Sequence, residues 1–321
     1  MRKIVVSVVG TLILASVSLA EAQQTTTIPR IGLIASTGAF ESFQQGLRDL
    51  GYVDGKNIVI VHQYAKGRLD RMPPFVHEFV QQKVDVIVAT NNVVIQAAKE
   101  ATKTIPIVMI SSVDPVAAGY VQSFARPGGN ITGLTTIGRD LSAKRVEFLK
   151  ELLPKMSRVG VLWDSDAPGP AVAFKEYKEA TQAFKLELIP LSILGPDPDL
   201  AGAFQAARTA RTEALIVVGN PLMNQHARRV FELSIKNRLP SMTEERRYVD
   251  AGGLISYGAS ATDLSRRAAG YVVEILKGAK PGDLQVRLPE KFETFINLKT
   301  AQQLGLVIPH HVLIQVDKVI K

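Results

Sequence analysis

Short polar segments follow several apolar runs of this chain, and their residue types suit the binding of a small charged molecule. Hydroxyl and amide side chains beside the free N–H groups of a helix start favour a carboxylate or a similar anion. A carboxylate in the same position, such as Asp114 or Asp164, could instead receive an ammonium group. The same residue types also favour helix caps and turns, so only the set as a whole indicates a site. The segments are residues 36–38, 90–92, 111–115, 164–166 and 219–221.

Two aromatic residues near these segments could cover the body of a flat ligand. Trp163 ends an apolar run just before Asp164, and an indole there could stack on an aromatic ring. Tyr257 ends another such run. Taken singly, each of the two favours core packing. We therefore predict a ligand site with no catalytic residue and no metal ligand. Its predicted members are Ser36, Thr37, Thr90, Asn91, Ser112, Asp114, Thr135, Trp163, Asp164, Asn220 and Tyr257.

The chain shows no arrangement of residues that demands catalysis. It has no Gly-x-Ser-x-Gly motif, no phosphate-binding loop with Lys and Ser or Thr, and no dinucleotide fingerprint after the first apolar run. Cysteine is absent, which excludes a thiolate nucleophile. Of the 5 histidines, only the adjacent His310 and His311 stand close together, and their place near the C-terminus favours a solvated tail. We expect a binding protein that is not an enzyme and needs no cofactor.

Strands and helices predicted from hydrophobic periodicity alternate along most of the chain. Helices between apolar strands are typical of βαβ units with a mostly parallel sheet covered on both faces. The first set has predicted strands at 31–35, 57–62, 84–89, 105–110 and 131–135, with helices at 40–50, 71–82 and 93–102. The second set has predicted strands at 158–163, 187–191, 214–218, 239–242 and 253–257, with helices at 142–152, 171–184, 198–210 and 224–237. The last part predicts a helix at 263–277, strands at 285–288 and 294–297, and a helix at 298–304.

Two α/β sets of similar size predict two doubly wound, Rossmann-like lobes. We assign residues 23–137 with part of 258–321 to an N-terminal lobe, and residues 138–257 to a C-terminal lobe. Ligands of open α/β sheets bind beyond the carboxyl ends of the strands. Two such sheets facing each other would place the polar segments around a cleft, and lobes of this kind close on a ligand by hinge motion.

The first 22 residues have the order of a secretory signal peptide. Arg2 and Lys3 precede an apolar run at 4–17, and Ala20 and Ala22 then supply the small residues of a cleavage site. A membrane-spanning helix needs roughly 20 apolar residues, so this run is too short to be an anchor. We expect cleavage after Ala22, with Ala20 as the alternative. Because the chain has no cysteine for a lipid anchor, we expect a free periplasmic monomer.

The formal net charge of +8 leaves several classes of partner open, among them nucleic acid, an anionic membrane surface and an acidic ligand. Basic residues are scattered with acidic ones between them, as in 139–151 and 175–187, which favours solvated helix faces. Export also argues against a nucleic-acid partner. Since there are no disulfides, burial must stabilise the fold, and about 300 residues suffice for two medium-sized domains.

Several stretches of the chain resemble a known family of binding proteins. The most distinctive is ARPGGNITG at 125–133, and AGGLISYG at 251–258 and FINLKTA at 295–301 are further matches. Shorter matches lie at 45–52, 55–58, 67–73, 83–88, 104–108 and 114–116. The likeness covers nearly the whole chain after the predicted signal peptide. On these stretches the chain is similar to the periplasmic substrate-binding proteins of ABC importers, a family related to tryptophan and tyrosine binders.

The resemblance implies a type I periplasmic-binding fold with three crossings between the lobes and no enzymatic activity. It also implies two partners, which are a small-molecule ligand such as an amino acid or small carboxylate, and an ABC permease in the inner membrane. Two other functions remain open. The same lobes could serve a sensor for a membrane receptor, and cleft carboxylates could serve a periplasmic α/β enzyme. A branched aliphatic amino acid or a purely anionic metabolite is the alternative to a flat zwitterionic ligand.

Overall fold

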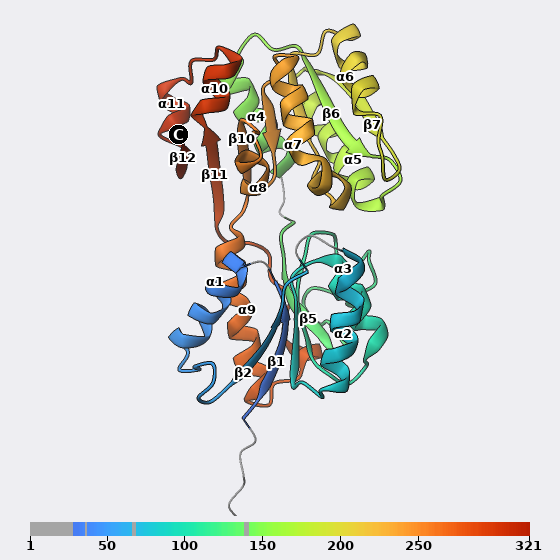
Figure 1. The fold of residues 1–321 in the computed structure, drawn as a ribbon, viewed down its shortest axis with the longest axis vertical. Coiled ribbons are helices and arrows are strands. Elements are labelled where there is room, and N and C mark those ends of the chain that lie inside the picture. The colour runs from blue at the N-terminus through green and yellow to red at the C-terminus, as the bar shows by residue number, and fades with distance from the viewer. Residues whose placement is uncertain (1–27, 36, 66–68, 138–140) are drawn as a thin grey trace, which may run out of the picture.

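The computed structural model describes residues 28–35, 37–65, 69–137 and 141–321. Its two lobes lie one above the other along the longest axis, and each contains a sheet with helices on both faces (Figure 1). The predicted α/β class with two doubly wound lobes is therefore confirmed. The predicted signal peptide and Ser36 fall outside the described residues.

The N-terminal lobe contains a five-stranded parallel sheet in the order β2-β1-β3-β4-β5. Its strands are β1 (Arg30–Ile34), β2 (Val59–Gln63), β3 (Val86–Ala89), β4 (Ile107–Ser111) and β5 (Ile131–Thr135). Strands β3, β4 and β5 are buried along their whole length, as expected of apolar runs covered on both faces. Helices α1 (Thr37–Asp49) and α9 (Ala261–Leu276) pack on one face. Helices α2 (Met72–Gln81), which follows the 3-10 helix η1 (Leu69–Arg71), and α3 (Asn92–Ala101) pack on the other.

The C-terminal lobe contains a seven-stranded sheet in the order β12-β11-β10-β9-β8-β6-β7. Its strands are β6 (Arg158–Asp164), β7 (Glu187–Ile193), β8 (Ala214–Val217), β9 (Ser241–Thr243), β10 (Ile255–Ala259), β11 (Phe292–Asn297) and β12 (Lys318–Ile320). All neighbours are parallel except β10 and β11. One face carries α4 (Leu141–Leu152), α5 (Pro168–Ala183), α10 (Leu298–Leu304) and α11 (His310–Leu313). The other carries α6 (Leu200–Thr209), α7 (Pro221–Lys236) and α8 (Arg246–Asp250).

Three segments connect the lobes, as the family resemblance implied. The first leads from β5 to α4, the second from β10 to α9, and the third from the 3-10 helix η2 (Pro281–Asp283) to β11. The second and third lie side by side, because β10 and β11 pair as far as Ala259 and Phe292. Beyond that pair, the Ser260 N–H donates to Lys291 O at 2.9 Å. Two of the three connections therefore form one hydrogen-bonded ribbon.

The segment 285–288 is not the strand that its pattern predicts. Arg287 exchanges hydrogen bonds with the backbone of Gly133 (3.0 Å) and Thr135 (3.2 Å), but the pairing amounts only to an isolated bridge between Leu134 and Arg287. Pro289 follows almost at once and has no N–H to continue a ladder. The chain then turns into the third connection instead of extending the sheet.

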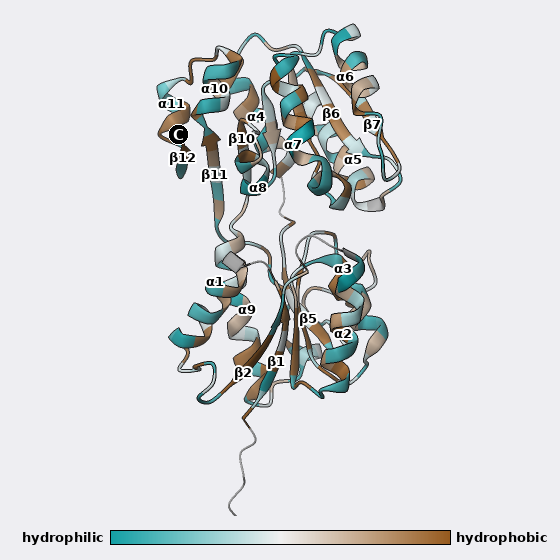
Figure 2. Ribbon diagram, in the orientation of Figure 1, coloured by the Kyte–Doolittle hydropathy of each residue, from teal (hydrophilic) through white to brown (hydrophobic). Residues whose placement is uncertain are grey.

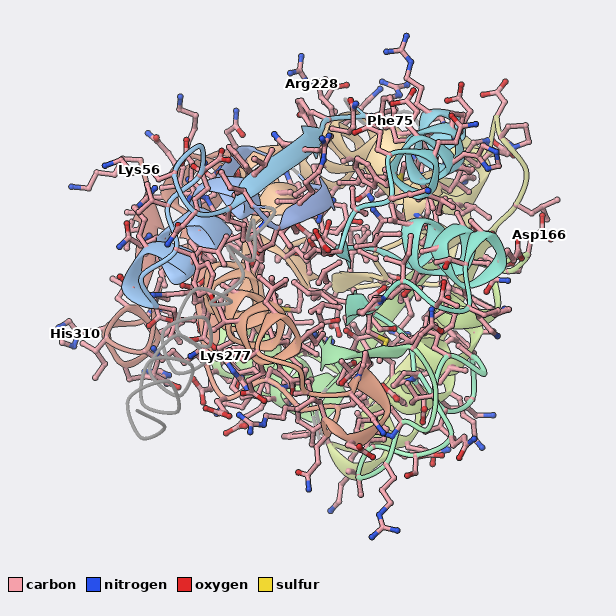
Figure 3. The ribbon with its side chains drawn as sticks, turned by 90° about the horizontal axis from the view of Figure 1, so that it is seen from below. Lys56, Phe75, Asp166, Arg228, Lys277 and His310 are labelled. Carbon is pink, nitrogen blue, oxygen red and sulfur yellow. The ribbon has the colours of Figure 1, made fainter. Side chains whose placement is uncertain are left out.

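Hydrophobic residues gather in the two sheets, whereas the outward faces of the helices are hydrophilic (Figure 2). The charged side chains of Lys56 and Arg228 lie at the periphery of the molecule, and both are exposed, as is Lys277 (Figure 3). This agrees with the expectation that scattered basic residues lie on solvated faces. Within the described ranges, no helix combines the length and the apolar character that crossing a membrane requires.

Candidate ligand site at the facing strand ends

The carboxyl ends of strands β1–β5 and of strands β6–β10 point toward the other lobe, whereas β11 and β12 run in the opposite direction (Figure 1). In open α/β sheets, ligands bind where the order of successive strands reverses direction. That switch point lies between β1 and β3 in the N-terminal lobe, and between β6 and β8 in the C-terminal lobe. The strand order therefore directs two potential binding edges at each other.

Thr90 bridges the switch point of the N-terminal lobe. Its Oγ1 donates to Ile34 O at the end of β1, at 2.8 Å. The next residue, Asn91, caps α3, because its side-chain oxygen accepts from the Val94 N–H at 3.1 Å. Thr37 is the first residue of α1, on the other side of the switch point. Segment 90–92 therefore forms the helix cap that its residue types favour. This cap lies at the carboxyl-end edge of the N-terminal sheet, where a ligand is expected.

Asn92, which belongs to the predicted polar segment 90–92 but was not among the predicted site residues, joins the segments that follow β3 and β4. Its Nδ2 donates to Ser112 Oγ at 2.7 Å, and its Oδ1 accepts from Ser111 Oγ at 3.1 Å. At the end of β5, Thr135 Oγ1 donates to Ser111 O at 3.0 Å. Three strand ends are therefore held in one hydrogen-bonded network that includes the exposed Ser112.

Asp114 stabilises the turn that follows β4. Its Oδ1 accepts from the Val116 N–H at 2.8 Å and from the Ala117 N–H at 3.1 Å. The residue is exposed. The turn therefore uses one carboxylate oxygen, and water surrounds the side chain.

A flat aromatic pair lies beside the N-terminal switch point. The rings of Phe40, in the first turn of α1, and His62, on β2, are stacked with centroids 4.1 Å apart and an interplanar angle of 2°. His62 Nε2 lies 3.1 Å from Ala35 O, directly after β1. Both side chains are half-buried. This geometry offers partly exposed ring surface close to the strand ends.

Asp164 and Asn220 bridge the switch point of the C-terminal lobe. Asn220 Nδ2 donates to Asp164 Oδ2 at 2.6 Å, and both side chains are buried. The oxygen of the same amide accepts from the Met223 N–H at 2.7 Å and so caps α7. Asp164 Oδ1 accepts from the Asp166 N–H at 3.0 Å. The Asn220 amide therefore forms hydrogen bonds both with a free N–H group at the start of α7 and with the buried Asp164 carboxylate.

Arg145 and Glu244 form a charged cluster at the same edge, and the sequence analysis did not name either residue. Arg145 stands in a stretch of alternating charges that favoured a solvated face, and that expectation is wrong for this residue, which is 6% exposed. Its Nε donates to Tyr257 O at 2.8 Å, and its Nη1 donates to Tyr177 Oη at 3.0 Å. The same Nη1 lies 3.4 Å from Glu244 Oε1. Glu244 follows β9 directly, which is the one signal that could have placed it at the strand ends.

Burial affects the ionisation of this cluster. It raises the pKa of the Glu244 carboxyl above its ordinary value, and the nearby positive charge of Arg145 opposes that effect only in part. Burial disfavours the charged form of Arg145, but the interactions with Tyr177 and Glu244 outweigh it and raise the pKa of the guanidinium. The cluster therefore holds a firmly charged arginine beside a carboxylate that is poorly solvated.

Trp163 and Tyr257 pack in the C-terminal lobe on the side of α4 and α5. The Trp163 ring stacks on Phe174 with centroids 4.6 Å apart, and its Nε1 is buried without a hydrogen-bond partner. Tyr257 lies between Phe148, at a centroid distance of 5.4 Å, and Phe292, at 5.8 Å. Both rings are half-buried and already have ring partners within the chain. A ligand could contact only the part of each that stays exposed.

The predicted site residues thus lie in two groups, one in each lobe. No hydrogen bond between described residues joins the groups. The lobes approach each other at Val113 and Gly169, where a Cβ added to Gly169 would lie 3.3 Å from Val113 Cγ1. Between the lobes, the candidate site is therefore formed by two facing edges, each of which is held together internally.

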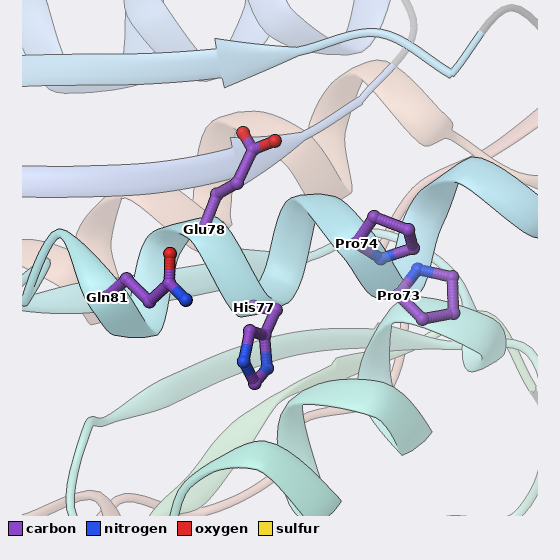
Figure 4. A pocket seen from close by; sticks show the side chains of 5 residues that line it. All are labelled: Pro73, Pro74, His77, Glu78 and Gln81. Atoms are coloured by element: carbon purple, nitrogen blue, oxygen red, sulfur yellow. The ribbon is translucent and has the colours of Figure 1, made fainter.

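Two surface hollows of the described residues lie elsewhere. One of ≈ 440 Å³ is lined by residues of α2 alone, which are Pro73, Pro74, His77, Glu78 and Gln81 (Figure 4). Another of ≈ 220 Å³ lies between α1 and β2. Neither lining includes a predicted site residue. Nor does any group of three or more His, Asp and Glu side chains in the described part of the chain have an arrangement that could hold a metal ion.

The fold and the facing edges define a two-lobed α/β binding protein, and a family match agrees with this class. The model of a family described as "ABC transporter substrate binding protein" matches residues 35–320. The chain belongs to this family, and it has the solute-binding role of an ABC transport system. The predicted family membership and type I periplasmic-binding fold are confirmed.

Individual relatives cover most of the chain. The tyrosine-binding protein of Clostridioides difficile strain R20291 is 30% identical over 275 residues, or 84% of this chain and 76% of the relative. A crystal structure of an ABC domain in complex with L-Trp, from Streptococcus pneumonia, has a TM-score of 0.81 at 25% identity and covers 92% of this chain and all of that one. A ligand-free, open structure of a substrate-binding protein with adhesive properties, from Clostridium difficile, has a TM-score of 0.73 at 25% identity over the same shares.

Proposed function

We propose that this protein is the periplasmic solute receptor of an ABC importer and that it binds an aromatic amino acid between its lobes. The observation that carries the proposal is the arrangement of the two switch points, each bridged by a polar side chain and directed at the other lobe. The names of two relatives support the ligand class, because one is called tyrosine-binding and another was solved with L-Trp.

The polar edges suit the charged end of an amino acid. Helices α3 and α7 both begin at the facing edges, and the N-terminus of a helix carries a partial positive charge with free N–H groups. Hydroxyl groups of Thr90 and Ser112 stand beside the start of α3. A ligand carboxylate would find hydrogen-bond donors here without the need for a basic side chain.

The apolar body of the ligand requires flat surfaces at the same edges. The Phe40–His62 stack supplies one in the N-terminal lobe, and the exposed parts of Trp163 and Tyr257 supply others in the C-terminal lobe. Aromatic pairs contribute roughly 0.5–1.5 kcal/mol beyond the burial of their area. An aliphatic side chain would gain only the burial, which is why we favour an aromatic ligand.

The proposal extends to the cell compartment and to the assembly state. The mature chain starts at Gln23 after export, stays free in the periplasm as a monomer, and delivers its ligand to an inner-membrane permease. It catalyses no reaction and binds no nucleic acid. These points rest on the residue order at the N-terminus and on the family membership.

Thermal unfolding of the exported protein tests the proposal. The full chain is expressed, recovered from a periplasmic extract, checked by mass for a start at Gln23, and heated with single amino acids and small carboxylates. A ligand at 100 times its Kd stabilises the folded state by about 2.7 kcal/mol. We expect L-tyrosine or L-tryptophan to raise Tm by several degrees and L-leucine and succinate to leave it unchanged. Stabilisation by L-leucine or succinate alone would show that the ligand class is wrong.

A further inference from the structure

The carboxylates near the facing edges differ in how far the fold shelters them and in how accessible they remain. Asp164 accepts one hydrogen bond at each oxygen, from the Asp166 N–H and from Asn220. Asp114 is exposed and holds a turn. An ion pair in such a solvated position contributes little to binding. Neither carboxylate has both the shelter and the accessibility that recognition of an ammonium requires, because Asp164 is only 8% exposed and Asp114 is not sheltered.

Glu244 has both. Its side chain is 24% exposed, so part of it reaches the surface at the carboxyl end of β9. Its cationic partner, Arg145 Nη1, lies at 3.4 Å, which is longer than a good charge-assisted hydrogen bond. The carboxylate also accepts a hydrogen bond from the backbone N–H of Gly219. Burial keeps this carboxylate short of hydration and raises its pKa. A second cation that reached the exposed part would therefore gain more here than at the surface.

Two backbone segments hold Glu244 in a narrow space. A Cβ on Gly258 of β10 would lie 2.0 Å from Glu244 O, and a Cβ on Gly219, after β8, would lie 3.3 Å from Glu244 Oε2. The approach of Gly258 to the Glu244 backbone requires glycine, and the Gly219 backbone lies close to the carboxylate. The side chain is therefore positioned before any ligand arrives, and the tight support of Arg145 by Tyr177 and by Tyr257 O fixes its partner as well.

The charge around Arg145 is negative in excess. Glu176 and Glu245 both raise the pKa of Glu244 through repulsion, while Arg145 is the cation that lowers it. Glu245 pairs with Arg247, and Glu176 accepts from Ser142 Oγ at 3.1 Å. One buried arginine thus faces more than one carboxylate, and an additional positive group at this edge would reduce the imbalance.

From this geometry we propose that Glu244, positioned by Arg145, receives the α-ammonium group of the ligand when the lobes close. The inference rests on the proposed function, because it requires a zwitterionic ligand between the lobes. It assigns the two ends of the ligand to different lobes: the carboxylate binds the N-terminal lobe at the start of α3, and the ammonium binds the C-terminal lobe after β9. The C-terminal lobe therefore selects for an amino group.

Calorimetry with a pair of ligands that differ only in the amino group tests the assignment. L-tyrosine and L-tryptophan are each compared with the same molecule lacking its α-amino group, on wild type, Glu244→Gln and the control Glu232→Gln, which changes an exposed carboxylate on α7 outside this cluster. Loss of one partner of a sheltered charge pair typically lowers affinity by about 30-fold or more. We expect that loss for the amino acid with Glu244→Gln, little change for its desamino analogue, and affinities within about twofold of wild type for Glu232→Gln.

The outcomes separate the two proposals. If wild type binds none of the amino acids, the proposed ligand class fails and this assignment fails with it. If wild type binds them and Glu244→Gln binds equally well, or loses the amino acid and the desamino analogue alike, Glu244 has only a structural role and this inference alone is overturned. Should Glu244→Gln melt below the assay temperature, Glu244→Asp replaces it. That variant keeps the charge but shortens its reach, and we expect it to weaken the amino acid more than the analogue; equal weakening would refute the assignment.

Discussion

Individual side chains at the facing edges serve structural and binding roles together, and Asn220 is the clearest case. Its amide caps α7 and also donates to the buried Asp164. Asn91 caps α3 in the same manner but has no buried carboxylate beside it. The two residues therefore form a natural comparison between a cap alone and a cap that also satisfies a buried charge.

We predict that Asn220→Ala destabilises the protein more than Asn91→Ala. Loss of an N-cap costs about 0.5–2 kcal/mol of unfolding free energy. Loss of the donor to Asp164 adds about 1–3 kcal/mol, because a buried acceptor is left unsatisfied. Urea unfolding of both variants measures the difference, with wild type as reference. Equal losses for the two variants would show that the Asp164 contact contributes nothing to stability.

At the scale of single residues, the sequence predicted where a side chain lies in the fold better than it predicted which side chains it contacts. Residues such as Asn91 and Asn220 could be placed at strand ends, because an apolar run followed by an amide marks the end of a strand and the start of a helix. Their contacts could not be predicted, since Asp164 and Asn220 are 56 residues apart in the chain. Arg145 was missed for a related reason. Alternating charges are typical of a solvated helix, and only contacts with Tyr177 and Tyr257 O reveal that this one is buried.

Among the elements, the contact between α1 and α9 connects the hinge to the N-terminal switch point. Helix α1 starts directly after β1, and α9 starts directly after the second connection between the lobes. The two helices approach closely at Gly46, where an added Cβ would lie 2.4 Å from Arg266 O. Gly270 on α9 has nothing within 4 Å of the same added atom. An alanine substitution should therefore have opposite effects at the two positions.

We predict that Gly46→Ala is destabilising and that Gly270→Ala is neutral or stabilising. In both cases alanine is favoured over glycine in a helix, by up to about 1 kcal/mol of unfolding free energy. At Gly46 a backbone clash outweighs this gain, and overpacking of this kind costs about 1–3 kcal/mol. Thermal unfolding of the two variants compares them directly. A higher Tm for Gly46→Ala than for Gly270→Ala would contradict the close approach of α1 and α9.

Most helices and strands could be predicted from hydrophobic periodicity. The features that were predicted wrongly or not at all depend on which segments of the chain pair with each other. Except for the short edge strand β12, which was not predicted, the strands of both sheets are apolar runs bounded by polar segments, so their existence follows from local pattern. Segment 285–288 has the same pattern, yet it forms one isolated bridge because Pro289 ends its backbone pairing. The antiparallel pairing of β11 with β10 likewise depends on where the chain re-enters the second lobe, which no local pattern contains.

At the scale of the whole molecule, the proposed binding mode requires two lobes that move relative to each other about three connections. The alternation of strands and helices predicts two α/β units, but it says nothing about how often the chain passes between them; that feature came from the family resemblance. The return of α9 to the first lobe and of β11 to the second creates the extra connections. Because two of them form a hydrogen-bonded ribbon, they should bend together when the lobes close.

Small-angle X-ray scattering of the mature chain, with and without L-tyrosine or L-tryptophan, tests the central claim most directly. Each sample is measured at a ligand concentration shown by calorimetry to saturate the protein. Since a ligand held by both edges draws the lobes together, the account predicts a smaller radius of gyration in the bound state at an unchanged molecular mass. The same radius of gyration at saturation would contradict it, because the ligand would then be bound outside the facing strand ends or by one lobe alone.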